Sequence, residues 1–184
     1  AVTADKLDIE APAVVICHQD ELKSLFEQGA LEKDCVIVAR FQGPSANGMP
    51  ELHKLMPILG ILQDRGHAVA LVTDGRLSGA SGKVPAAIHV TPEAAQGGAI
   101  GLIQNGDMIK LNVANGVLLV MLDEAALASR TFPASPTQPG TVGRGLFALS
   151  RAAVNDAEHG GCTLFGLDKP AAPSPCKEHS SVSA

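Results

Sequence analysis

Residues 68–83 read AVALVTDGRLSGASGK, an apolar run that passes directly into a loop of glycine and polar residues. The run over 68–72 predicts a strand, and residues 73–83 predict a loop with several small-residue hinges. Proteins of the α/β class place reactive side chains directly downstream of a strand. This loop is therefore the segment of the chain with the strongest functional signal.

Strand and helix signals alternate on both sides of this loop. An apolar run at 13–17 predicts a strand, and apolar residues at helical spacing predict a helix over 20–28 that stops at Gly29. A strand is expected at 35–39 and another at 86–90. Between them, a helix is expected from Pro50 to about residue 64, with a kink at Pro57. After the second strand, Thr91 is expected to cap a short helix that has Pro92 in its first position and ends at Gly97-Gly98. The alternation predicts an α/β fold with an aliphatic core, since aromatic residues make up only 3% of the chain.

A β-rich segment follows this alternation. Asn-Gly pairs at 105–106 and 115–116 are strong turn signals. They border the strand-like runs 108–113 and 117–122, which predict a hairpin or meander. Asp123 is expected to cap a short helix after the second run.

The chain of 184 residues divides into three expected parts. Residues 1–131 carry the alternating pattern and are expected to form one domain core. Residues 132–161 begin with a segment rich in Pro, Ser and Thr and continue with weak helical periodicity, which predicts a linker and a weak helix. Residues 162–184 are expected to be a disordered tail.

Charge and composition argue against several classes of partner. The chain has 14 basic and 19 acidic residues, a net charge of −5 and no run of Lys or Arg, so nucleic acid is not an expected partner. No stretch approaches the roughly 20 apolar residues of a membrane span, and the amino end lacks the build of a signal peptide, so we expect a cytoplasmic protein with no membrane partner.

The four cysteines lie far apart without zinc spacing and are expected to be structural.

The loop at 73–83 matches neither of two well-known catalytic motifs. A nucleotide-binding P-loop would need glycine in place of Leu77 and Ser or Thr in place of Val84, and the hydrolase elbow would need glycine in place of Arg76. Ser78 is left with two interpretations, a turn residue or a reactive serine. The backbone N–H groups of the loop, with Lys83, could also hold an anion.

Glu51 is the second candidate. It follows Gly-Met-Pro at an expected helix start, where a carboxylate either complements the helix dipole or offers an oxygen to a hard cation such as Mg²⁺. His53 and Lys54 lie beside it and, with Lys83, are candidates for binding a phosphate group. Each of these residues can equally be a solvated surface residue, as can His89.

Four segments appear in an order that resembles a known family. They are residues 40–44 (RFQGP), 48–51 (GMPE), 73–79 (TDGRLSG) and 91–98 (TPEAAQGG). Together they are similar to the ordered signature of the dihydroxy-acid and sugar-acid dehydratases, over roughly residues 13–130. The flanking SAN, LHKL and ASGKVP segments resemble the branch of that family that acts on 6-phosphogluconate.

The resemblance implies a hydro-lyase that removes water from 6-phosphogluconate to give 2-keto-3-deoxy-6-phosphogluconate, with an iron–sulfur cluster and Mg²⁺. By motif position, Ser78 is the base that takes the C2 proton and Glu51 is a Mg²⁺ ligand. Metal cations would assist because the charge that develops at C2 adds to that of the neighbouring carboxylate. The loop residues assigned to substrate binding are Asp74, Arg76, Ser81 and Lys83, and for Asp74 and Arg76 the alternative is that they brace the loop.

The resemblance also implies partners. The cluster cysteines of the family belong to a larger amino-terminal domain with no counterpart here, so none of the four cysteines is assigned to the cluster. We expect an excised domain that is inactive alone, that completes its site with its own amino-terminal domain, and that belongs to a homodimer. The implied fold is α/β, similar to the swivelling β/β/α domain of the family, with a mixed sheet or small barrel flanked by helices.

Two alternatives remain open from the sequence. One is a dehydratase domain for another sugar acid or dihydroxy acid, since the phosphate-binding residues are not identified. The other is a non-catalytic module for anion binding or oligomerisation that uses the loop at 73–83 only to hold an anion.

Overall fold

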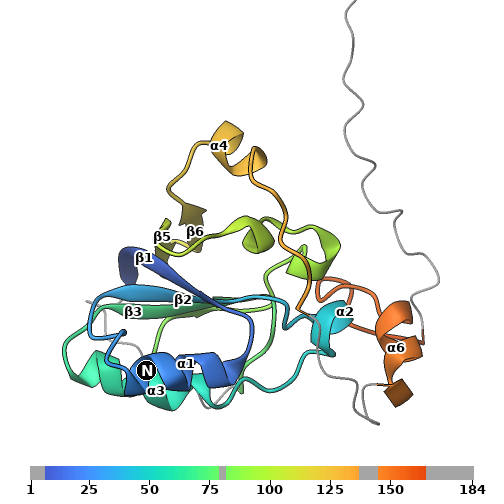
Figure 1. The fold of residues 1–184 in the computed structure, drawn as a ribbon, viewed down its shortest axis with the longest axis horizontal. Helices are drawn as coiled ribbons and strands as arrows, with labels where there is room; N and C mark the ends of the chain where they lie inside the picture. The colour runs from blue at the N-terminus through green and yellow to red at the C-terminus, as the bar shows by residue number, and fades with distance from the viewer. Residues whose placement is uncertain (1–6, 79–81, 137–144, 165–184) are drawn as a thin grey trace, which may run out of the picture.

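A mixed sheet organises the chain (Figure 1). The computed structural model describes residues 7–78, 82–136 and 145–164, and in these ranges six strands lie in the order β4-β3-β2-β1-β5-β6. The strands are Asp8–Ile16 (β1), Cys35–Ala39 (β2), Val69–Thr73 (β3), Ala86–Ala87 (β4), Met108–Asn112 (β5) and Val117–Val120 (β6). β1 to β4 pair in parallel, whereas β5 pairs antiparallel with both β1 and β6. The predicted α/β class with a mixed sheet is confirmed.

Two helices cover one face of the parallel strands. They are α1 (Gln19–Glu27) and α3 (Leu55–Asp64), which lie side by side beneath the sheet in Figure 1. Leu22 and Leu59 are fully buried against Ile37 and Leu71 of the sheet. Every residue of β2 and β3 is buried, because parallel strands are usually covered on both faces.

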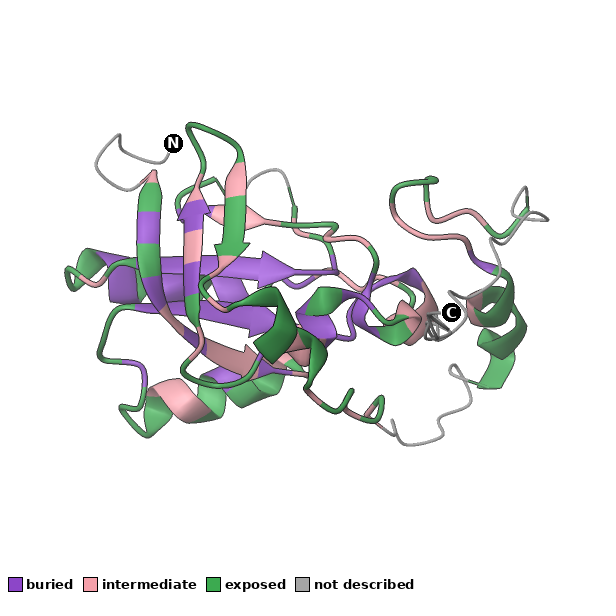
Figure 2. Cartoon of the chain, turned by 90° about the horizontal axis from the view of Figure 1, so that it is seen from above, coloured by how far each residue is buried: buried purple, intermediate pink, exposed green. Residues whose placement is uncertain are grey.

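The opposite face carries a second core. Val36 and Val38 of β2 point to this side and share a cluster with Ile109 and Leu111 of β5, because the sheet curls into a half-barrel. Two 3-10 helices, η2 (Ala94–Gln96) and η3 (Ala99–Leu102), also pack on this side. Figure 2 shows the buried residues concentrated in the strands and the exposed ones towards the outer hairpin and the helices.

Three short helices complete the described part. α2 (Pro44–Asn47) follows β2, α4 (Glu124–Ala128) follows β6, and α6 (Ala148–Ala153) packs against α2 (Figure 1). α6 lies within the region where a weak helix was predicted. The boundaries of the three expected parts stay predictions, and residues 165–184 of the predicted tail lie outside the described residues.

Three local predictions were wrong. The helix expected from Pro50 begins only at Leu55, because Glu51 forms a β-bridge with Arg76 instead. The strand expected over 86–90 is only two residues long. The helix that Thr91 was expected to cap is a 3-10 turn that Glu93 precedes.

No helix within the described ranges is long and apolar enough to cross a membrane.

Candidate functional site

The loops that follow β2 and β3 meet at one edge of the sheet. Because the two strands are parallel, their carboxyl ends lie together, and ligands of open α/β sheets bind at such edges. Residues 40–51 leave β2 and residues 74–78 leave β3. The parallel bridge between Glu51 and Arg76 joins the two loops. Two segments of the predicted signature are thus brought into contact.

Glu51, Arg76 and Ser78 form the centre of this edge. The Glu51 carboxylate accepts a hydrogen bond at 2.7 Å from Nη1 of Arg76 through Oε2, and one at 2.6 Å from the backbone N–H of Ser78 through Oε1. Glu51 is half-buried, whereas Arg76 and Ser78 are exposed. The carboxylate therefore fixes the start of the serine loop while the serine itself faces outward.

Asp74 supports this edge from below. It is fully buried, and its carboxylate accepts hydrogen bonds from the backbone N–H groups of Phe41, Gln42 and Ala94 at 2.9–3.0 Å. Burial raises the pKa of Asp74, and these three hydrogen bonds oppose that rise. Of the two roles predicted for Asp74, bracing of the loop is the one that these contacts support.

Glu93 is a second buried carboxylate that the sequence did not single out. It is 1% exposed, and its oxygens accept from the backbone N–H groups of Ser45 and Ala46 at 2.9 and 3.0 Å. These N–H groups belong to the first turn of α2, where a negative charge is favourable. The available signal was an acidic residue within an otherwise small and apolar segment at 91–98.

The other predicted substrate contacts lie elsewhere or are not described. Nζ of Lys83 donates to both oxygens of Asp64 on α3 at 2.6 and 2.5 Å, so its ammonium group is directed to the helix. Lys54 pairs with Asp20 at 2.8 Å. Ser81 lies outside the described residues. Of the five predicted site residues that are described, the structure thus brings Glu51, Arg76 and Ser78 together above Asp74 and leaves Lys83 apart.

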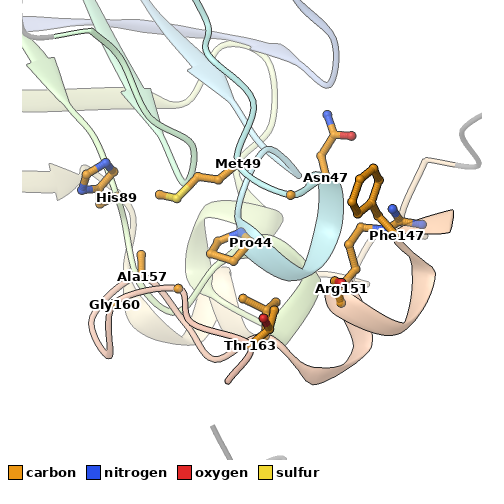
Figure 3. Close-up of a pocket in the computed structure, with 13 residues that line it drawn as sticks. Pro44, Asn47, Met49, His89, Phe147, Arg151, Ala157, Gly160 and Thr163 are labelled. Carbon is orange, nitrogen blue, oxygen red and sulfur yellow. The ribbon is translucent and has the colours of Figure 1, made fainter. Parts of the chain in front are cut away.

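A cleft of about 790 Å³ adjoins this edge (Figure 3). Met49, which lies two residues before Glu51, lines it, and the carbonyl oxygen of Met49 accepts from Nε of Arg76 at 2.9 Å. The other lining residues are Pro44, Asn47, Gly48, His89, Phe147, Ser150, Arg151, Val154, Ala157, Gly160, Gly161 and Thr163. The cleft therefore lies between α2 and the segment that contains α6. Sequence patterns carry no signal for this cleft, because its two walls lie about 100 residues apart in the chain.

Comparison with known proteins gives the family. The family described as dihydroxy-acid/6-phosphogluconate dehydratase C-terminal matches residues 1–161. The chain belongs to this family.

Relatives of this dehydratase domain are much longer proteins. The chain is 52% identical to the phosphogluconate dehydratase of Pseudomonas aeruginosa and 54% identical to that of Escherichia coli K12, over 89% and 90% of its own length. It is 38% identical to the dihydroxy-acid dehydratase of Pyrobaculum neutrophilum over 87% of its length. The chain spans only 27–28% of the length of these relatives.

The donor atoms of the dehydratase domain fit one part of a Mg²⁺ site. Mg²⁺ is usually held by one or two carboxylates together with waters and substrate. Glu51 can supply one such carboxylate, since each of its oxygens keeps a lone pair beyond the hydrogen bond it accepts. Across the described ranges no three Asp, Glu, His or Cys residues gather as a metal site, so further ligands would have to come from outside them.

The cysteines of the described part do not fit an iron–sulfur cluster. Cys35 is fully buried within the apolar core of β2, where burial raises the pKa of its thiol to about 11, and it belongs to no group of three or more metal-binding side chains among the described residues. Its burial confirms the structural role predicted for it. Cys17 and Cys162 are partly exposed and belong to no group of metal-binding side chains among the described residues.

Proposed function

We propose that this chain is the carboxy-terminal domain of a cytoplasmic hydro-lyase that dehydrates 6-phosphogluconate to 2-keto-3-deoxy-6-phosphogluconate. The higher identity to phosphogluconate dehydratases than to the dihydroxy-acid dehydratase supports the choice of substrate. The domain would complete its site with an amino-terminal domain of the same protein, in a homodimer. The iron–sulfur cluster would be held by that other domain.

One observation carries the proposed role of Ser78. The backbone N–H of Ser78 is anchored on Glu51 at 2.6 Å, so the serine is presented at the carboxyl edge of the sheet beside the carboxylate that could hold Mg²⁺. Bound Mg²⁺ would supply positive charge that lowers the pKa of a neighbouring hydroxyl and stabilises negative charge on the substrate. Ser78 is thus placed to act as a base once its hydroxyl proton is removed.

The reaction requires one proton transfer to the serine. Oγ of Ser78, as the alkoxide, takes the proton from C2, the electron pair of the C2–H bond forms the C2–C3 double bond, and the C3–O bond breaks to release hydroxide. The proton gained by Ser78 then passes to this hydroxide, which leaves as water, and the alkoxide is restored. The resulting enol rearranges to the 2-keto acid. Arg76 holds Glu51 in place through its 2.7 Å ion pair, and Asp74 fixes the loop that carries Arg76 and Ser78.

Substitution of Ser78 in the complete enzyme tests this role. Ser78→Ala should lower kcat by about 100-fold or more, because general base catalysis contributes about that much or more. Binding of 6-phosphogluconate should change little. Ser24→Ala, on the outer surface of α1, is the matched control and should keep full turnover. Unchanged turnover in Ser78→Ala would remove Ser78 as the base.

The chain alone is proposed to be inactive, because Glu51 is the one carboxylate that it is proposed to give to Mg²⁺ and no group of three metal-binding side chains gathers among its described residues. The purified chain should release no 2-keto acid from 6-phosphogluconate in the presence of Mg²⁺. Turnover at a rate comparable to that of the complete enzyme would contradict this proposal.

A further inference from the structure

The cleft between α2 and α6 has the charge character of an anion site. Among the described residues that line it, Arg151 and His89 carry basic groups and none is Asp or Glu. This is notable in a chain with a net charge of −5. The hydroxyl groups of Ser150 and Thr163 add further hydrogen-bond donors. From the described part of the lining, an anion entering the cleft would therefore meet hydrogen-bond donors and no carboxylate.

The backbone of the cleft is held in an uncommon conformation. Met49 and His89 adopt φ values of 55° and 56°, in the left-handed region that non-glycine residues rarely occupy. Two hydrogen bonds hold them: the His89 N–H donates to the carbonyl of Gly75 at 3.0 Å, and Nε of Arg76 donates to the carbonyl of Met49 at 2.9 Å. Such conformations cluster at ligand sites. Both residues are tied to the loop that carries Ser78.

The cleft also suits the size and the direction of a sugar-acid phosphate. Its volume of about 790 Å³ lies within the range of small-molecule sites. Figure 3 shows His89 and Arg151 on opposite sides of it. Because the phosphate of a 6-phosphorylated acid lies at the opposite end from C2, its binding group must lie away from Ser78. Arg151 on α6 lies across the cleft from His89, whose backbone N–H is bonded to Gly75 in the loop that carries Ser78.

We propose that this cleft binds the phosphate end of the substrate and that Arg151 selects phosphorylated over unphosphorylated sugar acids. This rests on the proposed function above. A guanidinium group binds two phosphate oxygens at once, which gives both affinity and orientation. His89 borders the opposite side, near the reactive loop.

Binding measured in an inactive background tests the proposal apart from the chemistry. In the complete enzyme carrying Ser78→Ala, calorimetry would give Kd for 6-phosphogluconate and for gluconate. Adding Arg151→Ala should weaken 6-phosphogluconate binding about 10- to 100-fold and leave gluconate binding within about twofold. Arg151→Lys should restore part of the loss. Inorganic phosphate should compete with 6-phosphogluconate only where residue 151 is basic. Arg65→Ala, whose guanidinium pairs with Glu32, is the control and should change neither Kd.

Three results would overturn the proposal. The first is an equal loss of affinity for both ligands in Arg151→Ala, which indicates a structural role for Arg151. The second is no loss of affinity for 6-phosphogluconate. The third is a parent enzyme that does not bind 6-phosphogluconate more tightly than gluconate. These outcomes are distinct from failure of the proposed function. If Ser78→Ala retained turnover, Ser78 would not be the base, and the effect of Arg151→Ala would be read from the Kd of inorganic phosphate, which is not turned over.

Discussion

The α carbon of Gly43 lies directly against the buried side chain of Glu93. A Cβ atom at position 43 would come within 2.7 Å of Cδ and 2.8 Å of Cβ of Glu93. Glu93 cannot withdraw easily, because its two oxygens accept from the first N–H groups of α2. The φ of Gly43 is −70°, which any residue can adopt. Glycine is therefore required at this position because there is no space for a side chain, and not because of the backbone conformation.

Gly43→Ala should destabilise the chain by about 1–3 kcal/mol, the usual cost of overpacking a filled core. Urea unfolding followed by circular dichroism would measure the loss. Gly60→Ala is the control, because a Cβ there meets only Lys83 side-chain atoms at 3.7 Å or more. In the helix interior that change should be neutral or stabilising. Equal effects of the two substitutions would contradict the packing argument.

Asp74→Asn should cost about 1–3 kcal/mol. An amide has one acceptor oxygen in place of two, so at least one of the three buried backbone N–H groups loses its partner and faces an NH₂ group instead. Equilibrium unfolding would again give the difference. Asp64→Asn, which removes an exposed pair with Lys83, should change stability much less. A similar loss in both variants would show that Asp74 does not hold the loop.

Arg130 and Asp107 should make stability depend on pH. The Arg130 guanidinium donates two hydrogen bonds to Asp107, at 2.5 and 2.8 Å, and lowers its pKa in the folded chain. The unfolded chain therefore takes up this proton at a higher pH than the folded chain. The stabilisation is present above the unfolded-state pKa of about 3.9 and is lost as the pH falls through the lowered folded-state value.

Arg130→Met should consequently lower the urea midpoint at pH 7, and the difference from the parent chain should shrink below about pH 4. Part of the difference should persist at low pH, because Arg130 also donates to the carbonyl of Leu102. Lys110→Met removes an exposed pair with Glu10 and serves as the control. A difference that is constant from pH 7 to pH 3 would show that the Asp107 pair contributes nothing.

Glu51→Gln in the complete enzyme should raise the Mg²⁺ concentration needed for half-maximal turnover. The amide keeps an acceptor for the Ser78 N–H but loses the charge that a hard cation prefers. A titration of Mg²⁺ against initial rate would measure the shift, with Glu10→Gln on β1 as the control. Identical Mg²⁺ dependence in Glu51→Gln and parent enzyme would remove Glu51 as a ligand.

Local patterns predicted β2 and β3 well, because burial on both faces leaves unbroken apolar runs. β1 begins at Asp8 and not at the predicted residue 13, and β4 is only two residues long. The strand at 35–39 was predicted with its observed bounds, and the turn pairs at 105–106 and 115–116 correctly placed the hairpin of β5 and β6. The start of α3 was missed because Pro50 is an ordinary helix-start signal. The bridge from Glu51 to Arg76 that displaces it is a contact between distant segments.

The candidate site, like the fold, could be predicted where its residues are close in the sequence and not where they meet only through tertiary packing. Residues within one loop, such as Arg76 and Ser78, could be grouped by sequence alone. Glu51 was a separate candidate from its place after Gly-Met-Pro, and the resemblance to the dehydratase family joined it to the same site. The approach of Arg151 to the cleft depends on tertiary packing, for which neither spacing nor composition gives a signal. For Glu93 the sequence offers only its place as the one acidic residue of segment 91–98, and its burial against α2 comes from packing.

The packing of α6 on α2 places one wall of the cleft in the last described segment of the chain, whereas the loop with Ser78 lies about 70 residues earlier. If the proposals hold, reactivity and choice of ligand are encoded in separate stretches of sequence. Exchange of residues 145–164 between members of the family would then change which acids are bound and leave the chemical step unchanged. In this way one domain architecture could acquire new substrates.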